Sequence, residues 1–130
     1  MRTLLTSLAV ASVALGLTAC GGGGNGGGDT PTVTVKPGQP VHVKGSEYKF
    51  QPADIVLEGG GARKFEFENT GSLAHNLRIM ENGAEVGGTP TFQGGETKSA
   101  TVSLQHGEYE LVCTVGDHAS LGMTAKLTVK

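Results

Sequence analysis

Hydrophobic and polar residues alternate along most of the chain from Pro31 onward, and no stretch of ten residues repeats apolar positions with a helical period. Alternation with a period of two places successive side chains on opposite faces of a strand. The alternating runs are separated by Gly, Pro and Asn, which are typical of turns. We therefore predict strands at 32–36, 41–44, 48–50, 55–57, 64–68, 75–80, 97–104, 107–113 and 123–129.

Short strands at this spacing are typical of two sheets packed face to face. We predict one all-β domain over residues 32–130, a Greek-key β-sandwich of about seven to nine strands. The stretch 83–96 is rich in Gly and Thr, and we expect it to be an irregular loop.

The first residues follow a different pattern. Arg2 is the only charged residue before Asp29, and 4–17 is almost entirely apolar or small. A membrane-spanning helix needs about 20 such residues, whereas a shorter apolar run after a basic start is typical of a signal peptide. The run ends in Leu-Thr-Ala-Cys at Cys20, which resembles the bacterial lipobox. We expect a signal peptide at 1–19 and a lipid on the Cys20 thiol, the alternative being a plain secretory signal with a chance cysteine.

Glycine makes up 22 of the 130 residues, and seven of the glycines lie between Cys20 and Asp29. This segment has almost no side-chain volume, so we interpret 20–31 as the lipidated cysteine and a flexible tether. The net charge of −2 and the lack of a Lys/Arg run argue against a nucleic-acid partner. Because the Cys20 thiol would carry lipid, it is not available for a disulfide with Cys113.

Three potential metal ligands lie in one connection between two predicted strands, with the spacing Cys113-x4-His118-x4-Met123. A thiolate and a thioether select soft metals, copper above all. Zinc sites rarely use Met, and one Cys with one His cannot complete a structural zinc site. A trigonal His₂Cys set with a long axial Met is the geometry of blue-copper electron transfer, so a second His must come from elsewhere.

The candidates for this second histidine are His42, His75 and His106. His75 begins a predicted strand, where its side chain can meet a loop at the same end of a sandwich. His42 lies between two valines and is expected on the opposite face, and His106 lies in a turn. We expect both of these to be surface residues.

The residues that carry a family resemblance are Asn69-Thr-Gly, His75-Asn76, Tyr109-x-Leu-x-Cys113, His118 and Gly122-Met123 before the last strand. Over 32–130 the chain resembles the small blue copper proteins, the cupredoxins of the azurin, plastocyanin and auracyanin kind. It departs from them in having Gly-Asp117 before His118, where the family often has Pro-Gly, and in lacking the azurin disulfide.

The resemblance implies one type 1 copper that cycles between Cu(I) and Cu(II). Its ligands would be His75, Cys113, His118 and the weak axial Met123. Asn76 and Thr114 would not bind the copper themselves but would hold these ligands in position. Asn76 is expected to tie the His75 strand to the Cys113 loop, with one hydrogen bond directed toward the Cys113 sulfur.

We expect a membrane-tethered one-electron carrier, monomeric and not an enzyme, that exchanges electrons with respiratory or photosynthetic complexes. His118 would lie at the surface within a small apolar patch of Leu73, Ala119, Leu121 and Gly122, with Pro90 as a further candidate. Such patches suit weak, short-lived redox complexes. The protein would be exported and anchored at the outer face of a bacterial cytoplasmic membrane, or to an outer membrane.

The alternative function is a copper carrier or store that delivers copper to an oxidase. A copper enzyme of the multicopper-oxidase or nitrite-reductase kind needs adjacent His-Cys-His ligands, and Cys113 is flanked by Val112 and Thr114. A binuclear copper centre needs two cysteines in this loop, which has one.

Overall fold

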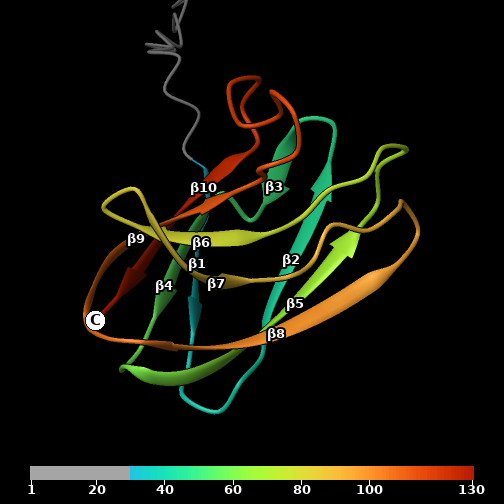
Figure 1. Ribbon diagram of the computed structural model, residues 1–130. Coiled ribbons are helices and arrows are strands. Elements are labelled where there is room, and N and C mark those ends of the chain that lie inside the picture. Colours follow the sequence, from blue (N-terminus) through green and yellow to red (C-terminus); the bar gives the residue numbers. More distant parts are fainter. Residues whose placement is uncertain (1–29) are drawn as a thin grey trace, which may run out of the picture.

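The computed structural model describes residues 30–130, which form ten strands in two sheets packed against each other (Figure 1). The six-stranded sheet has the order β1 (Thr32–Val35), β4 (Asp54–Leu57), β10 (Thr124–Val129), β9 (Gly107–Val112), β6 (Arg78–Glu81) and β7 (Ala84–Gly88). The four-stranded sheet has the order β3 (Lys49–Gln51), β2 (Val41–Ser46), β5 (Gly61–Asn69) and β8 (Thr97–Leu104). The predicted all-β sandwich is confirmed.

The core lies between the two sheets and is built from the inward positions of the alternating strands. In β5, Phe65 and Phe67 are fully buried while Lys64 beside them is exposed. Phe67 packs edge-to-face against Phe50 and Phe92, with ring centroids 5.6 and 5.4 Å apart. Aromatic pairs of this kind contribute about 1 kcal/mol each beyond the area they bury. They link two strands of the four-stranded sheet to the segment of Phe92, which pairs with His75.

Three neighbouring strands of the six-stranded sheet end at the same level. Val112 of β9 is paired with Thr124 of β10 on one side and with Arg78 of β6 on the other. The residues just beyond this level therefore emerge side by side at one end of the sheet. Cys113 directly follows β9, and Met123 directly precedes β10.

Two details of the predicted strands are wrong. Residues 84–88, expected in an irregular loop, form the edge strand β7, which pairs with β6 through a register shift and brings the count to ten. Its residues are mostly exposed and include two glycines, so they show no apolar alternation. The strand predicted from His75 begins only at Arg78, because His75 pairs with Phe92 in an isolated bridge instead.

The predicted signal peptide, the lipid on Cys20 and the tether up to Asp29 lie outside the described residues. Within the described part, no helix is long and apolar enough to cross a membrane.

Candidate metal centre

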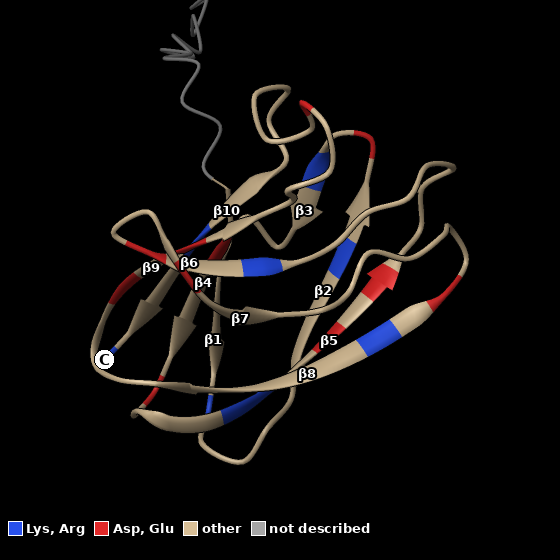
Figure 2. Ribbon diagram, in the orientation of Figure 1, with Lys and Arg blue, Asp and Glu red and all other residues tan. Residues whose placement is uncertain are grey.

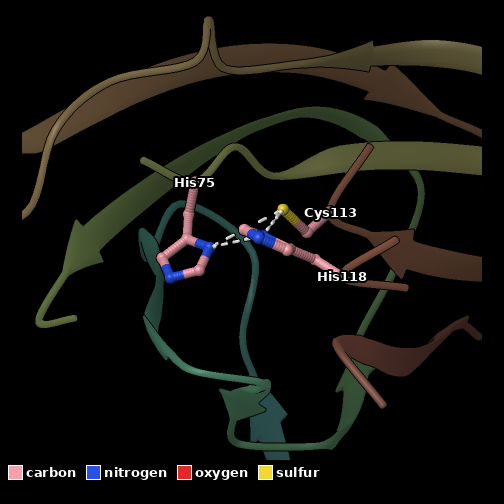
Figure 3. Close-up of side chains that lie close together, drawn as sticks. All are labelled: His75, Cys113 and His118. Carbon is pink, nitrogen blue, oxygen red and sulfur yellow. Dashed lines mark hydrogen bonds between the residues drawn. The ribbon is translucent and has the colours of Figure 1, made fainter. Parts of the chain in front are cut away.

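Two histidines and one cysteine converge at the end of the sandwich where β9 stops (Figure 3). Nδ1 of His75 lies 3.1 Å from Nδ1 of His118 and 3.8 Å from Sγ of Cys113, and the His118 Nδ1 lies 3.6 Å from the same sulfur. A triangle with these sides has a centre about 2 Å from each corner, which matches metal–imidazole bonds of about 2.0 Å and is slightly shorter than metal–thiolate bonds of about 2.3 Å. The donor set therefore fits one metal ion. Of the three sequence candidates for the second histidine, the structure brings His75 to the loop.

Met123 is joined to two of these residues through its backbone. Its N–H donates to the carbonyl of His118 at 3.0 Å, and its carbonyl accepts from the N–H of Cys113 at 3.1 Å. The Met123 side chain is fully buried. Trigonal His₂Cys donors with a nearby methionine are the arrangement of a type 1 copper site.

Gly45 of β2 makes room for the Met123 side chain. A Cβ on Gly45 would lie 2.9 Å from Cε of Met123 and 2.5 Å from Cε2 of Phe67. Contacts this short are repulsive, so the absence of a side chain at position 45 lets both groups pack at the base of the site.

Asn76 holds the His75 segment against the Cys113 segment. Its Nδ2 donates to the hydroxyls of Thr114 and Thr91, at 2.9 Å each, and its Oδ1 accepts from the Thr114 N–H at 2.8 Å. The tie between the two segments that we predicted is therefore present. Within residues 30–130, the bond predicted toward the Cys113 sulfur is not formed, and Nδ2 donates to hydroxyl oxygens.

Asn69 shapes the connection that carries His75. Its Nδ2 donates to the carbonyls of Leu73 and Phe92 at 2.9 and 3.1 Å, and its Oδ1 accepts from the Gly71 N–H at 3.0 Å. Asn69 is fully buried. It therefore fixes the loop immediately before His75 to the segment that pairs with His75.

Two residues of the turn between β2 and β3 complete the site, and the sequence pattern did not single them out. Glu47 places its Oε1 3.0 Å from Nε2 of His75. The ring of Tyr48 lies 4.9 Å from the ring of His118 at a tilt of 56°. Both turn residues are 28 or more positions away from the histidine they contact, so no local signal links them.

The backbone N–H of Leu73 lowers the pKa of Glu47 to about 2, with further help from its own backbone and from His75 and against the opposing effect of burial. Glu47 is therefore a carboxylate at neutral pH. Figure 2 shows acidic positions in the two connections at this end, β2–β3 and β9–β10. The connections 70–77 and 113–123 contain no Lys or Arg.

The predicted surface patch is split between exposed and partly buried residues. Leu73 and Leu121 are 44% and 51% exposed, Gly122 is exposed, and Ala119 is half-buried. His118, expected at the surface, is only 8% exposed. The other two histidines are exposed: the side chain of His42 is 69% accessible and pairs with Glu66, and His106 lies on the surface.

Comparison with known proteins agrees with this geometry. The model of the copper-binding proteins of the plastocyanin/azurin family matches residues 29–130. Reduced auracyanin from Roseiflexus castenholzii superimposes with a TM-score of 0.63 at 17% identity, over 70% of this chain and 96% of that one. Rusticyanin from Thiobacillus ferrooxidans gives 0.61 at 23% identity, over 75% and 82%. Auracyanin A from Chloroflexus aurantiacus, described as a "blue" copper protein, gives 0.60 at 20% identity, over 77% and 100%. No curated protein matches the chain significantly by sequence.

Proposed function

The chain belongs to the plastocyanin/azurin family of copper-binding proteins, and on that premise we propose that it carries single electrons between redox proteins. Its His75, Cys113, His118 and Met123 form the donor set of a type 1 copper site. Copper held there supplies a one-electron couple between Cu(I) and Cu(II). The observation that carries the proposal is the buried donor triangle, of which His118, at 8%, is the most exposed member.

The donors are shielded from water and held from several directions. His75 and Met123 have no exposed surface, and Cys113 is 1% exposed. The hydrogen bonds of Asn76 and the backbone bonds of Met123 restrain the segments that bear these ligands. Ligands that keep their positions in both oxidation states make electron transfer fast, because little structure has to reorganise with each electron.

We propose that the electron enters and leaves the copper site through His118. It is the most exposed of the four donors, at 8%, and its ring packs against half-buried Tyr48. Tyr48 also approaches Gly122 through its carbonyl oxygen, while the neighbouring Glu47 binds the N–H of Leu73 at 2.7 Å. The β2–β3 turn thus contacts both chain segments that form the apolar patch, the one with Leu73 and the one with Gly122. A small apolar surface over the one accessible ligand suits brief contacts with a partner.

We further propose that the protein is exported and works as a monomer at a membrane, held by lipid on Cys20 through the glycine-rich segment that follows. Two or more acyl chains on one residue anchor a protein stably, whereas one does not. The anchor would lie on the outer face of a cytoplasmic membrane or on an outer membrane, and the partners would be respiratory or photosynthetic complexes.

An electron carrier is favoured over a copper carrier or an enzyme. A protein that delivers copper has to release it, and three of the four donors here are almost completely buried. An enzyme of the multicopper type would need adjacent His-Cys-His ligands, which Val112-Cys113-Thr114 does not provide.

The test is to load the purified full chain with Cu(II) and to record its visible spectrum. We expect a thiolate-to-copper absorption band at about 600 nm. Dithionite should bleach this band, and ferricyanide should restore it. Cys113→Ser should abolish the band, whereas His42→Ala should leave it intact. A chain that stays colourless and binds Zn(II) more tightly than Cu(II) would contradict the proposal.

A further inference from the structure

Glu47 meets His75 on the side of the imidazole ring opposite the donor triangle. Its Oε1 lies 3.0 Å from Nε2 of His75, while Nδ1 of the same ring faces Cys113 and His118. A neutral imidazole carries one hydrogen, and a carboxylate at one nitrogen draws the hydrogen there. The other nitrogen then keeps a free lone pair, which in His75 points into the donor triangle.

The carboxylate of Glu47 is held in a fixed position by the loop that leads to His75. The same Oε1 accepts hydrogen bonds from the backbone N–H groups of Ser72 at 3.0 Å and Leu73 at 2.7 Å. Gly71 leaves the space that the carboxylate fills, because a Cβ there would lie 2.7 Å from Oε2 and closer still to Oε1. Three features of one loop therefore fit the Glu47 side chain at this place.

The negative charge of Glu47 is not neutralised by a basic side chain. Within residues 30–130, its only ion-pair partner is His75, and no Lys or Arg lies within ion-pairing distance of its carboxylate. The His75 side chain is completely buried, whereas that of Glu47 is 27% exposed. The charge thus acts through a buried ring, where solvent screens it less than on an open surface.

We propose that Glu47 is a positioning residue of the copper site, which fixes the His75 tautomer that offers Nδ1 to the metal and lowers the reduction potential. The proposal rests on the one-electron function. The half-reaction concerned is Cu(II) plus one electron giving Cu(I), with no change in bound atoms. Because Cu(II) bears the larger charge, a nearby carboxylate stabilises it more than Cu(I). Carboxylate–histidine–metal pairs also raise the basicity of the ligand.

The chain contains a matched control for this pair. Glu66 of β5 lies 3.0 Å from Nδ1 of His42 on β2, and its side chain is 27% exposed, the same as that of Glu47. Unlike Glu47, it also pairs with Nζ of Lys64 at 2.9 Å. Neither Glu66 nor His42 belongs to the donor set. Glu66→Gln therefore removes the same charge from a carboxylate–histidine pair at a place away from the copper site.

The first experiment measures the midpoint potential of the copper-loaded chain and of its Glu47→Gln and Glu66→Gln variants by protein-film voltammetry. Gln keeps an oxygen acceptor for Nε2, so Glu47→Gln removes charge with little change in shape. We expect it to raise the potential by about 59 mV, a tenfold change in the ratio of Cu(II) to Cu(I) affinity. Glu66→Gln should change it by far less. Equal shifts in the two variants would overturn the proposal.

A second experiment uses the metal-free chain, so that it does not depend on redox activity. ¹⁵N NMR of the histidine rings should find the hydrogen of His75 on Nε2 in the natural chain. In Glu47→Leu, which lacks an acceptor, a substantial fraction should move to Nδ1. A hydrogen on Nδ1 in the natural chain, or no change in the variant, would overturn the proposal. If copper loading gave no absorption band at about 600 nm, the electron-carrier function would be refuted, but the tautomer result would still stand.

Discussion

Asn76 and Thr114 are joined by two reciprocal hydrogen bonds. The amide nitrogen of Asn76 donates to the Thr114 hydroxyl at 2.9 Å, and the Thr114 N–H donates back to the amide oxygen at 2.8 Å. Each residue directly follows a copper ligand, His75 in one case and Cys113 in the other. The pair therefore fixes the separation of two ligands that lie 38 positions apart in the chain.

Removal of this pair should weaken both the fold and the site. Asn76→Ala loses three hydrogen bonds at a buried position, so we expect the free energy of unfolding of the metal-free chain to fall by about 3 kcal/mol. Thr114→Val keeps the backbone bond and should cost about 1 kcal/mol. Urea unfolding followed by circular dichroism measures both. Equal losses in the two variants would contradict the two-way bond.

Gly45→Ala tests the space beneath the axial ligand. The added methyl group would press on Met123 and Phe67, and overpacking of this kind costs about 1–3 kcal/mol. We also expect a changed visible spectrum, because Met123 has to move. Ser46→Ala, at the next position, adds no atoms and serves as the control. An unchanged spectrum and unchanged stability in Gly45→Ala would show that Met123 does not depend on this space.

Met123→Leu separates the ligand role of this side chain from its role in packing. Leu has nearly the same volume, so the stability of the metal-free chain should change by less than about 1.5 kcal/mol. The loss of the thioether removes a weak donor to Cu(II), so the reduction potential should rise while the band near about 600 nm remains. Voltammetry and absorption spectroscopy measure these effects. An unchanged potential would argue that Met123 only fills the core.

Leu121→Asp tests the apolar patch without knowledge of a partner. Two copies of the protein can exchange an electron through the patch, and a negative charge added to each copy at this acidic end would make them repel more strongly. We expect electron self-exchange, measured from NMR line widths in mixtures of oxidised and reduced protein, to slow by about tenfold. Val86→Asp on β7 is the control, because Val86 is 39% exposed and Leu121 51%. Equal slowing in both variants would count against the patch.

Cys20→Ser tests the anchor. When the full chain is made in bacteria fed an alkyne-labelled fatty acid, the natural chain should take up the label and the variant should not. Cys113→Ser should retain the label, because its thiol is buried at the copper site. Label in Cys20→Ser, or none in the natural chain, would refute the lipid anchor.

The sequence alone was sufficient to predict the sandwich and the kinds of ligand. Strands such as β5 follow from the alternation of buried and exposed side chains, which is a local property of consecutive residues. The spacing of Cys113, His118 and Met123 lies within one connection, so the chemistry of three donors could be recognised together. The strand β7 could not be predicted in the same way, because an exposed edge strand with two glycines has no apolar face to reveal it.

Only the tertiary structure decided which side chains form hydrogen bonds with the ligands and with the segments that carry them. Glu47 and His75 are 28 positions apart, and Asn76 meets Thr91 and Thr114 across 15 and 38 positions. These contacts depend on how the ends of strands in two different sheets meet, which no periodicity along the chain encodes. Hydrogen bonds act over about 3 Å, so partners distant in sequence are set only when the packed sheets bring their loops to the same end.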